Sequence, residues 1–281
     1  MDAAPSRTAM LAAVSRGNLR IDAPQPWVLD DPFALVLVGP AWQEMRASMY
    51  AALPSDVVLE ASTGICTRSR YAEDRLAAGG FTQYVILGAG LDSFAWRRPD
   101  LLPPLTVFEV DHPASQAWKL KRAEELALPL TDSQVFVPVD FEVESLQDAL
   151  RNAGFDWDQP ALFAWTGVAP YLTEKAIEST FCTIATAAPG SEVALSYRAE
   201  DAALDDAGRE FIRIYAPIAA SLGEPVQPGP VIEIERLIGQ CGLTVVEHPA
   251  RADLEQRYFA GRTDGLRPWT VETLITARVP G

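Results

Sequence analysis

The chain has 281 residues, of which 48% are hydrophobic and 22% are charged. This composition allows a substantial buried core, as one large α/β domain or two small ones, and argues against disorder. The formal net charge of −15 argues against nucleic acid as a partner, because a protein that neutralises phosphates needs a basic face.

The N-terminus lacks the basic-then-apolar order of a secretory signal, and the apolar stretch 33–38 is too short to span a bilayer. Three cysteines lie far apart without C-x-x-C spacing: Cys66, Cys182 and Cys241. Their number and spacing predict reduced, buried thiols. With only His112 and His248, a histidine-rich metal site is excluded. We therefore expect a cytoplasmic, metal-independent protein that is not bound to a membrane.

Residues 1–80 carry no strong strand signal and are expected to form a helical cap. The expected helices are 9–14, 33–38 and 57–78. Asp31 is placed to cap the second helix, and Ser55 or Asp56 to cap the third, which ends at a pair of glycines.

From Phe81 onward, short apolar runs alternate with helical segments. The expected strands are 84–87, 105–111, 135–141, 161–168, 192–197, 243–247 and 271–279, and the expected helices are 113–126, 145–152, 173–187, 199–222 and 231–241. This alternation predicts an α/β, Rossmann-like fold with a seven-stranded, mostly parallel sheet and helices on both faces.

We expect a single domain in four segments, in chain order. These are the helical cap (1–80), a cofactor-binding core (81–198), a helical lid inserted after the fifth strand (199–230) and the end of the core sheet (231–281). A run of prolines and glycines near the end of the third segment separates it from the fourth.

The first strand runs directly into a Gly-x-Gly turn formed by Gly88, Ala89 and Gly90. Glycines permit a tight turn and let the backbone approach a ligand. The next strand ends in Glu109 and Asp111, which is where a nucleotide-binding α/β fold holds ribose hydroxyls. Ser93 replaces the third glycine of a dinucleotide fingerprint, which favours a ligand with ribose but no pyrophosphate. S-adenosylmethionine is the commonest such ligand.

Two further strand ends carry their own signatures. Asp140 and Phe141 end the third run, where an acid could accept from an adenine amino group and an aromatic ring could cover the base. The fourth run ends in Trp165, Thr166 and Gly167, and its small residues leave room at the sheet edge.

Taken together, these motifs resemble class I S-adenosylmethionine-dependent methyltransferases. Within that class the chain is similar to the leucine carboxyl methyltransferase family and its bacterial O-methyltransferase relatives, some of them from polyketide pathways. The matching segments are 30–34, 68–74, 87–93, 108–113 and 167–173, and the resemblance extends from about Arg16 to the C-terminus. It implies that the last strand is antiparallel and that extra helices cover the site.

The resemblance also implies roles for individual residues. Arg70 would pair with the cofactor carboxylate, and the glycine turn would approach the methionyl and ribose parts. Asp111, or alternatively Glu109, would accept from the ribose hydroxyls, while Asp140 and Phe141 would take the adenine. Arg16 lies near a basic position of the family's N-terminal segment. Many family members carry a glutamate where this chain has Trp165 and Thr166, which leaves the contacts around the sulfonium open.

These roles imply methyl transfer to an oxygen of a small organic acceptor. A carboxylate acceptor needs no general base, whereas a phenol would benefit from one. No base stands out, which favours a carboxyl or an acidic hydroxyl group as the methyl acceptor, and no residue is assigned a catalytic role. Tyr171, Tyr197 and Arg198 are the acceptor-pocket candidates, because they lie at strand ends.

Two alternatives remain open. One is an NAD-type oxidoreductase or epimerase on a related sheet, disfavoured by Ser93 and by the long helical segment before the first strand. The other is a non-catalytic relative that binds the cofactor, which the missing glutamate keeps open. The sequence does not indicate the oligomeric state.

Overall fold

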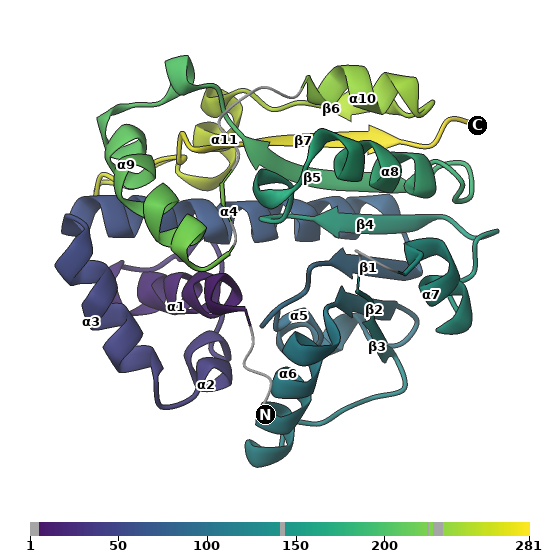
Figure 1. Ribbon diagram of the computed structural model, residues 1–281, viewed down its shortest axis with the longest axis horizontal. Coiled ribbons are helices and arrows are strands. Elements are labelled where there is room, and N and C mark those ends of the chain that lie inside the picture. The colour runs from purple at the N-terminus through teal and green to yellow at the C-terminus, as the bar shows by residue number, and fades with distance from the viewer. Residues whose placement is uncertain (1–5, 141–143, 224, 227–232) are drawn as a thin grey trace.

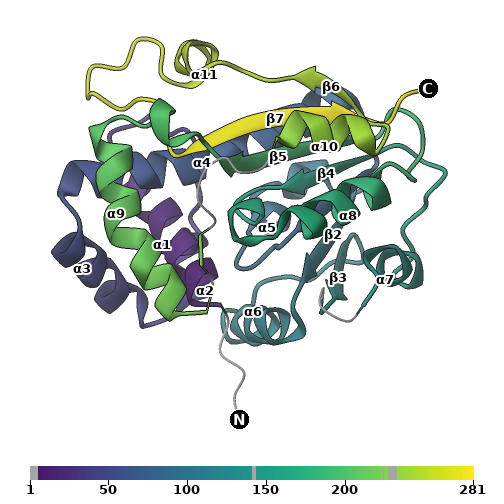
Figure 2. The same ribbon diagram turned by 45° about the horizontal axis from the view of Figure 1, so that its top comes forward.

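The fold combines a seven-stranded sheet with an N-terminal group of helices (Figure 1). The computed structural model describes residues 6–140, 144–223, 225–226 and 233–281. The N-terminal helices are α1 (Arg7–Asp22), α2 (Ala34–Val38), α3 (Trp42–Ala52) and α4 (Ser55–Gly79). Figure 2 shows α1, α2 and α3 gathered beside the sheet, with α4 extending from them along the strands.

The strands form one sheet in the order β3-β2-β1-β4-β5-β7-β6. They are β1 (Gln83–Leu87), β2 (Thr106–Asp111), β3 (Gln134–Pro138), β4 (Ala161–Trp165), β5 (Glu192–Arg198), β6 (Thr244–Glu247) and β7 (Glu272–Arg278). β7 is antiparallel to β5 and β6, whereas β1 to β5 pair in parallel. The predicted fold and the antiparallel last strand are both confirmed.

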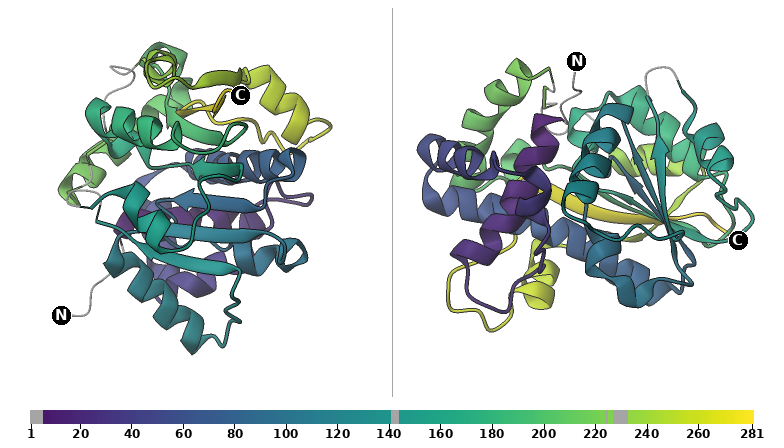
Figure 3. Two further views of the ribbon diagram at one scale, coloured as in Figure 1. Left: turned by 90° about the vertical axis from the view of Figure 1, so that its right-hand side faces the viewer. Right: turned by 90° about the horizontal axis from the view of Figure 1, so that it is seen from below.

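Helices bury both faces of the sheet (Figure 3). Val85 and Leu87 of β1 face α7 (Leu146–Asn152), α8 (Glu174–Ile184) and α10 (Ile234–Gln240). Tyr84 and Ile86 face α4, α5 (Phe94–Arg97) and α11 (Arg251–Tyr258). Successive residues of a strand point to opposite faces, so an unbroken apolar run is what a doubly covered sheet requires.

Two more helices join the sheet to the N-terminal group. On α6 (Pro113–Glu125), Ala123 packs in one cluster with Val14 of α1 and Leu37 of α2. α9 (Asp206–Ser221) lies within the expected lid segment and packs against α4 through Phe211. Short 3₁₀ turns complete the described elements: η1 (Pro99–Leu101), η2 (Ala169–Tyr171) and η3 (Asp201–Ala203).

The local signals in the sequence were partly correct. Asp31 Oδ1 accepts from the backbone N–H groups of Phe33 and Ala34 at 3.1 and 3.0 Å, and Gly80 ends α4 in the left-handed conformation with φ +66°. The predicted side-chain cap of α4 was wrong, because the helix begins at Ser55 itself, after Pro54. Helices α3 and α11 were not predicted, and the expected helix 199–222 is divided into η3 and α9.

The prediction of three reduced thiols was wrong. Cys182 of α8 and Cys241, which follows α10, form a disulfide, although 59 residues separate them in sequence. The packing of α10 against α8 brings their Cα atoms to 4.8 Å. Cys66 is free and buried, as expected, and burial raises its pKa to about 12.

None of the described helices is both long and apolar enough to cross a membrane.

A buried ion network joins the N-terminal helices to the segment that follows the glycine turn. Its members are Arg16, Asp31, Glu73 and Arg97, all of them less than a tenth exposed. Arg16 Nε lies 2.7 Å from Asp31 Oδ2, and Arg97 Nη2 lies 2.6 Å from Glu73 Oε1. Arg97 Nε is 3.9 Å from Asp31 Oδ1, so Asp31 lies between two guanidinium groups.

Burial alone would raise the pKa of the Asp31 carboxyl. The guanidinium groups of Arg16 and Arg97 outweigh that effect and hold the pKa below its ordinary value. A carboxyl whose pKa falls on folding stabilises the native state above its unfolded pKa, and this contribution is lost as the pH falls through the folded pKa.

Asp31→Asn is expected to lower the free energy of unfolding by about 3–5 kcal/mol at neutral pH, because it leaves two buried guanidinium groups under-compensated. Asp30→Asn is the matched control. Asp30 is 59% exposed and pairs with Arg20 at 2.9 Å, so its loss should change stability by about 0–1 kcal/mol.

Urea unfolding of both variants measures these differences. The gap between wild type and Asp31→Asn should narrow below about pH 3.9, the ordinary pKa of an aspartate. A gap that stays constant down to acid pH would contradict the assigned role of the Asp31 charge.

Candidate functional site

The carboxyl ends of β1, β2, β4 and β5 meet at one edge of the sheet, next to the N-terminal helices. β1 and β4 are parallel neighbours at the centre of the sheet, and the strand order reverses there, because β2 and β3 follow on one side of β1 and β4 and β5 on the other. In open α/β sheets, ligands bind outside the carboxyl ends of the strands at such a switch point.

The glycine turn after β1 has the conformation that the sequence predicted. Gly88 and Gly90 have φ of +69° and +51°, a region that favours glycine. The backbone N–H groups of Gly88 and Ala89 donate to the carbonyl of Val110 at 2.8 and 3.0 Å. The N–H of Gly90 donates to the Asp111 carboxylate, which also accepts from His112 N at 2.6 Å. The turn is therefore held against the end of β2.

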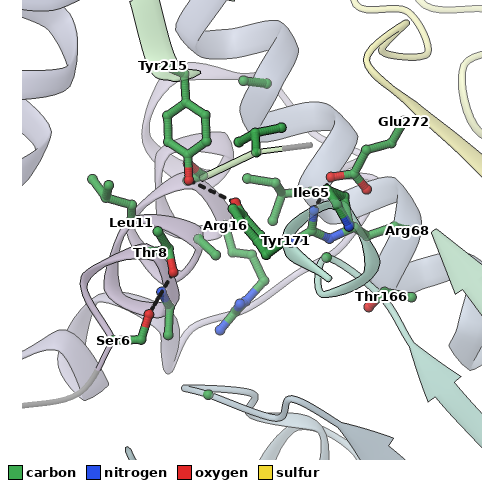
Figure 4. A pocket seen from close by; sticks show the side chains of 18 of the residues that line it. Ser6, Thr8, Leu11, Arg16, Ile65, Arg68, Thr166, Tyr171, Tyr215 and Glu272 are labelled. Carbon is green, nitrogen blue, oxygen red and sulfur yellow. Dashed lines mark hydrogen bonds and ion pairs between the residues drawn. The ribbon is translucent and has the colours of Figure 1, made fainter. Parts of the chain in front are cut away.

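A cavity of about 450 Å³ lies over this turn. Its walls come from α1, α3, α4, α9 and the ends of the strands, so it lies between the sheet and the N-terminal helices (Figure 4). A Cβ on Gly90 would lie 3.0 Å from Ala9 Cβ and 3.9 Å from Asp111 Oδ2. The space between the turn, β2 and the start of α1 is therefore narrow, and the absence of a side chain at Gly90 keeps it open.

Many of the residues singled out from the sequence line this cavity. They are Arg16, Gly88, Ala89, Gly90, Asp111, Thr166, Tyr171 and Arg198. The structure does not place the following described residues in the wall: Arg70, Glu109, Asp140, Trp165 and Tyr197. Phe141 lies outside the described residues.

Arg70 points away from the cavity. Its side chain is 45% exposed, and its Nε donates to Asp74 Oδ1 at 2.7 Å one turn further along α4. The arginine of α4 that lines the cavity is Arg68. Residues two apart on a helix differ by about 200° in direction, so only one of the two can face the site.

Glu109 is buried within the sheet instead of facing a ligand. Its carboxylate forms an ion pair with Lys119 of α6 and accepts from Gln134 Nε2 at 2.9 Å. Burial raises its pKa, and the Lys119 ammonium partly opposes that shift. Trp165 packs edge-on against Phe181 in the core.

Asp140 follows β3, close to the backbone at the end of β2. The N–H of the preceding residue, Val139, donates to the Asp111 carbonyl at 2.9 Å. The N–H of Asp140 itself donates to Glu144 Oε2 at 2.8 Å.

An ion pair between Arg68 and Glu272 lies in the cavity wall and was not predicted from the sequence. Both side chains are 13% exposed. Glu272 begins β7 and is the register partner of Arg198, which ends β5. A β-carbon on Gly167 would collide with the Arg68 guanidinium, so that glycine lets Arg68 lie against the turn after β4.

The part of the cavity away from the glycine turn is mostly apolar. We call it the apolar chamber and define it by these lining residues: Met45, Met49, Val58, Phe211, Ile214 and Trp269. Phe211 packs edge-on against Trp269 with ring centroids 4.9 Å apart.

Tyr171 and Tyr215 place their hydroxyls 2.9 Å apart beside this chamber (Figure 4). Burial raises the pKa of Tyr171, so its hydroxyl is neutral at ordinary pH. Tyr197 lies elsewhere, and its hydroxyl contacts His248 Nε2 at 3.1 Å.

Within the described ranges, no group of three or more His, Cys, Asp or Glu side chains is arranged to hold a metal ion.

Comparison with solved structures identifies the fold. A DUF574 family protein from Streptomyces avermitilis superposes with a TM-score of 0.68 at 18% identity, covering 99% of each chain. A structure described as a candidate methyltransferase from Thermobifida fusca gives 0.64 at 18% identity, covering 99% of this chain and 96% of that one.

Proteins that are similar to this chain in sequence are also described as methyltransferases. A Bacillus subtilis protein, YktD, named as a candidate S-adenosyl-L-methionine-dependent methyltransferase, is 34% identical over 66% of this chain and 62% of its own length. A Mycobacteroides abscessus protein with the same description is 29% identical over 85% of this chain and 82% of its own length. The chain thus spans less than two thirds of the length of YktD, as it does of a Mycolicibacterium paratuberculosis relative, of which it covers 61%.

The family model of leucine carboxyl methyltransferases matches residues 9–185, more than half of the chain. The match includes most of α1, Arg68, the glycine turn and the ends of β1, β2 and β4, whereas β5, α9 and β7 lie beyond it. This chain therefore belongs to the leucine carboxyl methyltransferase family.

Proposed function

We propose that this chain is an S-adenosylmethionine-dependent methyltransferase that methylates an oxygen of a small organic acceptor. One observation carries the proposal: a single cavity joins the glycine turn and Asp111 to an apolar chamber under α9. A methyltransferase needs a nucleoside site and an acceptor site that are open to each other, because the reacting atoms must meet in line.

The residues at the turn fit the nucleoside part of the cofactor. The turn presents backbone without side chains, and Asp111 lies at its edge to accept from ribose hydroxyls. We place the adenine at the edge of the cavity towards Asp140, which is not itself part of the wall and whose neighbour Val139 bonds to the backbone at the end of β2. We assign the cofactor carboxylate to Arg68 in place of Arg70, because Arg68 lines the cavity and Arg70 does not.

When bound, S-adenosylmethionine would supply a methyl group activated on a sulfonium. The acceptor oxygen would form the new C–O bond as the C–S bond breaks, the electron pair would stay on sulfur, and the proton of a hydroxyl acceptor would leave to bulk solvent when the product is released. The chain's own part is to align the two molecules and to keep water out, which the buried walls of the chamber support. Thr166, at the position of the family glutamate, adds no negative charge there.

Calorimetry with S-adenosylhomocysteine and with NAD separates this proposal from an oxidoreductase. We expect S-adenosylhomocysteine to bind and NAD not to bind. A non-catalytic relative would bind S-adenosylhomocysteine but transfer no methyl group from labelled S-adenosylmethionine to any acceptor.

Gly90→Val should weaken S-adenosylhomocysteine binding at least about tenfold, roughly 1.4 kcal/mol, because its side chain fills the gap between the turn, Ala9 and Asp111. Gly190→Val is the matched control. Gly190 also has a positive φ, at +89°, but has open space around its Cβ position. Both variants carry backbone strain, and only Gly90→Val should lose affinity in calorimetry. Equal affinities in two folded variants would contradict the placement of the site.

Arg68→Lys should reduce the preference for S-adenosylhomocysteine over its decarboxylated analogue by about 1.5–3 kcal/mol. The reason is that lysine cannot form bidentate hydrogen bonds with the cofactor carboxylate. Lysine keeps a cation beside Glu272, so the buried acid is not left unpaired. Arg70→Lys is the control and should leave the preference intact. If only Arg70→Lys changes the ratio of dissociation constants, the family-based assignment to Arg70 is correct and ours is wrong.

A further inference from the structure

Resting on the proposed function, we infer the class of the methyl acceptor. It is an uncharged, mainly apolar molecule whose reacting hydroxyl binds Tyr171, next to the apolar chamber. Three features of the cavity wall carry this inference: the surface of the chamber, the pairing of the nearby charges and the position of the tyrosine.

The chamber offers a large and firmly packed apolar surface. Phe211 stacks on Tyr215 with ring centroids 5.0 Å apart and rings 20° from parallel, and it packs edge-on against Trp269. Val58 of α4 is fully buried in the same cluster. Such a surface binds apolar groups by excluding water from both sides.

The buried arginines of the wall are already paired. Arg68 pairs with Glu272 and is the residue that we assign to the cofactor carboxylate, so it is not left to bind a charged acceptor. Arg198 donates to Asp201 Oδ1 and to the Ala199 carbonyl, each at 2.6 Å. The remaining Nε of Arg198 is a buried atom and has no hydrogen-bond partner among the described residues.

Arg16 is paired as well, with Asp31 and with the Leu91 carbonyl at 2.6 Å. The fourth arginine of the wall in the described ranges, Arg7, is exposed at the start of α1 and neighbours the turn side of the cavity, two residues before Ala9. A carboxylate entering the apolar chamber would therefore be desolvated without a dedicated cation, which is unfavourable.

Tyr171 can form a hydrogen bond with a neutral hydroxyl group in either orientation of its own phenolic O–H. If Tyr171 donates to Tyr215, its oxygen keeps lone pairs that accept; if it accepts from Tyr215, its own O–H remains to donate. An acceptor hydroxyl can donate or accept, so it suits both arrangements. A carboxylate suits only one of them.

The position of Tyr171 connects the two parts of the cavity. It ends η2, four residues after Gly167, and lies close enough to Arg68 and Glu272 for both charges to affect its pKa. Figure 4 shows it between Tyr215 and the Arg68–Glu272 pair. A hydroxyl held there lies beside the turn after β4, close to the Arg68 guanidinium that we assign to the cofactor carboxylate.

Three probes with one apolar body test the acceptor class: 4-butylphenol, 4-butylanisole and 4-butylbenzoate. Their dissociation constants are measured by calorimetry on the wild-type complex with S-adenosylhomocysteine. We expect 4-butylphenol to bind about fivefold more tightly than 4-butylanisole, which cannot donate. It should bind at least about tenfold more tightly than 4-butylbenzoate, which is charged. The tightest binding by 4-butylbenzoate, or no binding by any probe, would overturn the inference.

Tyr171→Phe and Tyr197→Phe form a matched pair of variants. Both remove a hydroxyl next to the sheet edge, but only Tyr171 lines the cavity. Tyr171→Phe should abolish the preference for 4-butylphenol over 4-butylanisole, and Tyr197→Phe should retain it. A preference unchanged in Tyr171→Phe would also overturn the inference. The head-group ranking in wild type stands as an independent test if Tyr171→Phe does not fold.

Binding of S-adenosylhomocysteine is measured before any probe is added. A protein that does not bind it contradicts the proposed function. A protein that binds it but prefers the charged probe contradicts only the acceptor class.

Discussion

The geometry of the site depends on the buried ion network of Arg16, Asp31, Glu73 and Arg97. Arg16 extends from α1 to the carbonyl of Leu91, the residue after the glycine turn, and Arg97 Nε donates to Ser93 Oγ at 2.9 Å. Because every member is buried, removing one leaves its partner uncompensated, so the group is retained or lost as a unit. The N-terminal helices and the turn are therefore fixed relative to each other, although Arg16 and Leu91 are 75 residues apart in the sequence.

A second constraint comes from the direction of β7. A parallel strand in that place would put its first residue at the far edge of the sheet. Because β7 is antiparallel, its first residue, Glu272, lies beside Arg198 at the carboxyl end of β5. There it pairs with Arg68 from α4. The wall of the cavity thus combines a helix of the N-terminal group with the last strand of the chain.

The cavity has two kinds of surface because its walls come from two kinds of element. Backbone groups and strand-end side chains border the turn, where β1 and β2 end. Side chains of α3, α4 and α9 form the apolar chamber, since amphipathic helices turn their apolar faces inward. The tyrosine pair stands where these surfaces meet, with Tyr171 from the segment after β4 and Tyr215 from α9.

The sequence by itself determined the features that depend on neighbours along the chain. The apolar run into Gly88 and Gly90, the acid ending β2 at Asp111 and the alternation of strands with helices were sufficient for the fold and for the turn side of the site. These are local patterns, in which strand periodicity and glycine conformation follow from consecutive residues.

Tertiary structure decided which side chains face the cavity. On α4 the spacing of Val58, Ala61 and Ile65 continues to Arg68, and this helical period could have favoured Arg68 over Arg70. For Glu109 no such signal existed, because its partner Lys119 lies on another element. The disulfide between Cys182 and Cys241 and the contacts of Glu272 and Tyr215 likewise join segments far apart in the sequence. Only the packing of helices on the sheet brings such residues together. A sequence pattern within one segment therefore cannot predict these contacts.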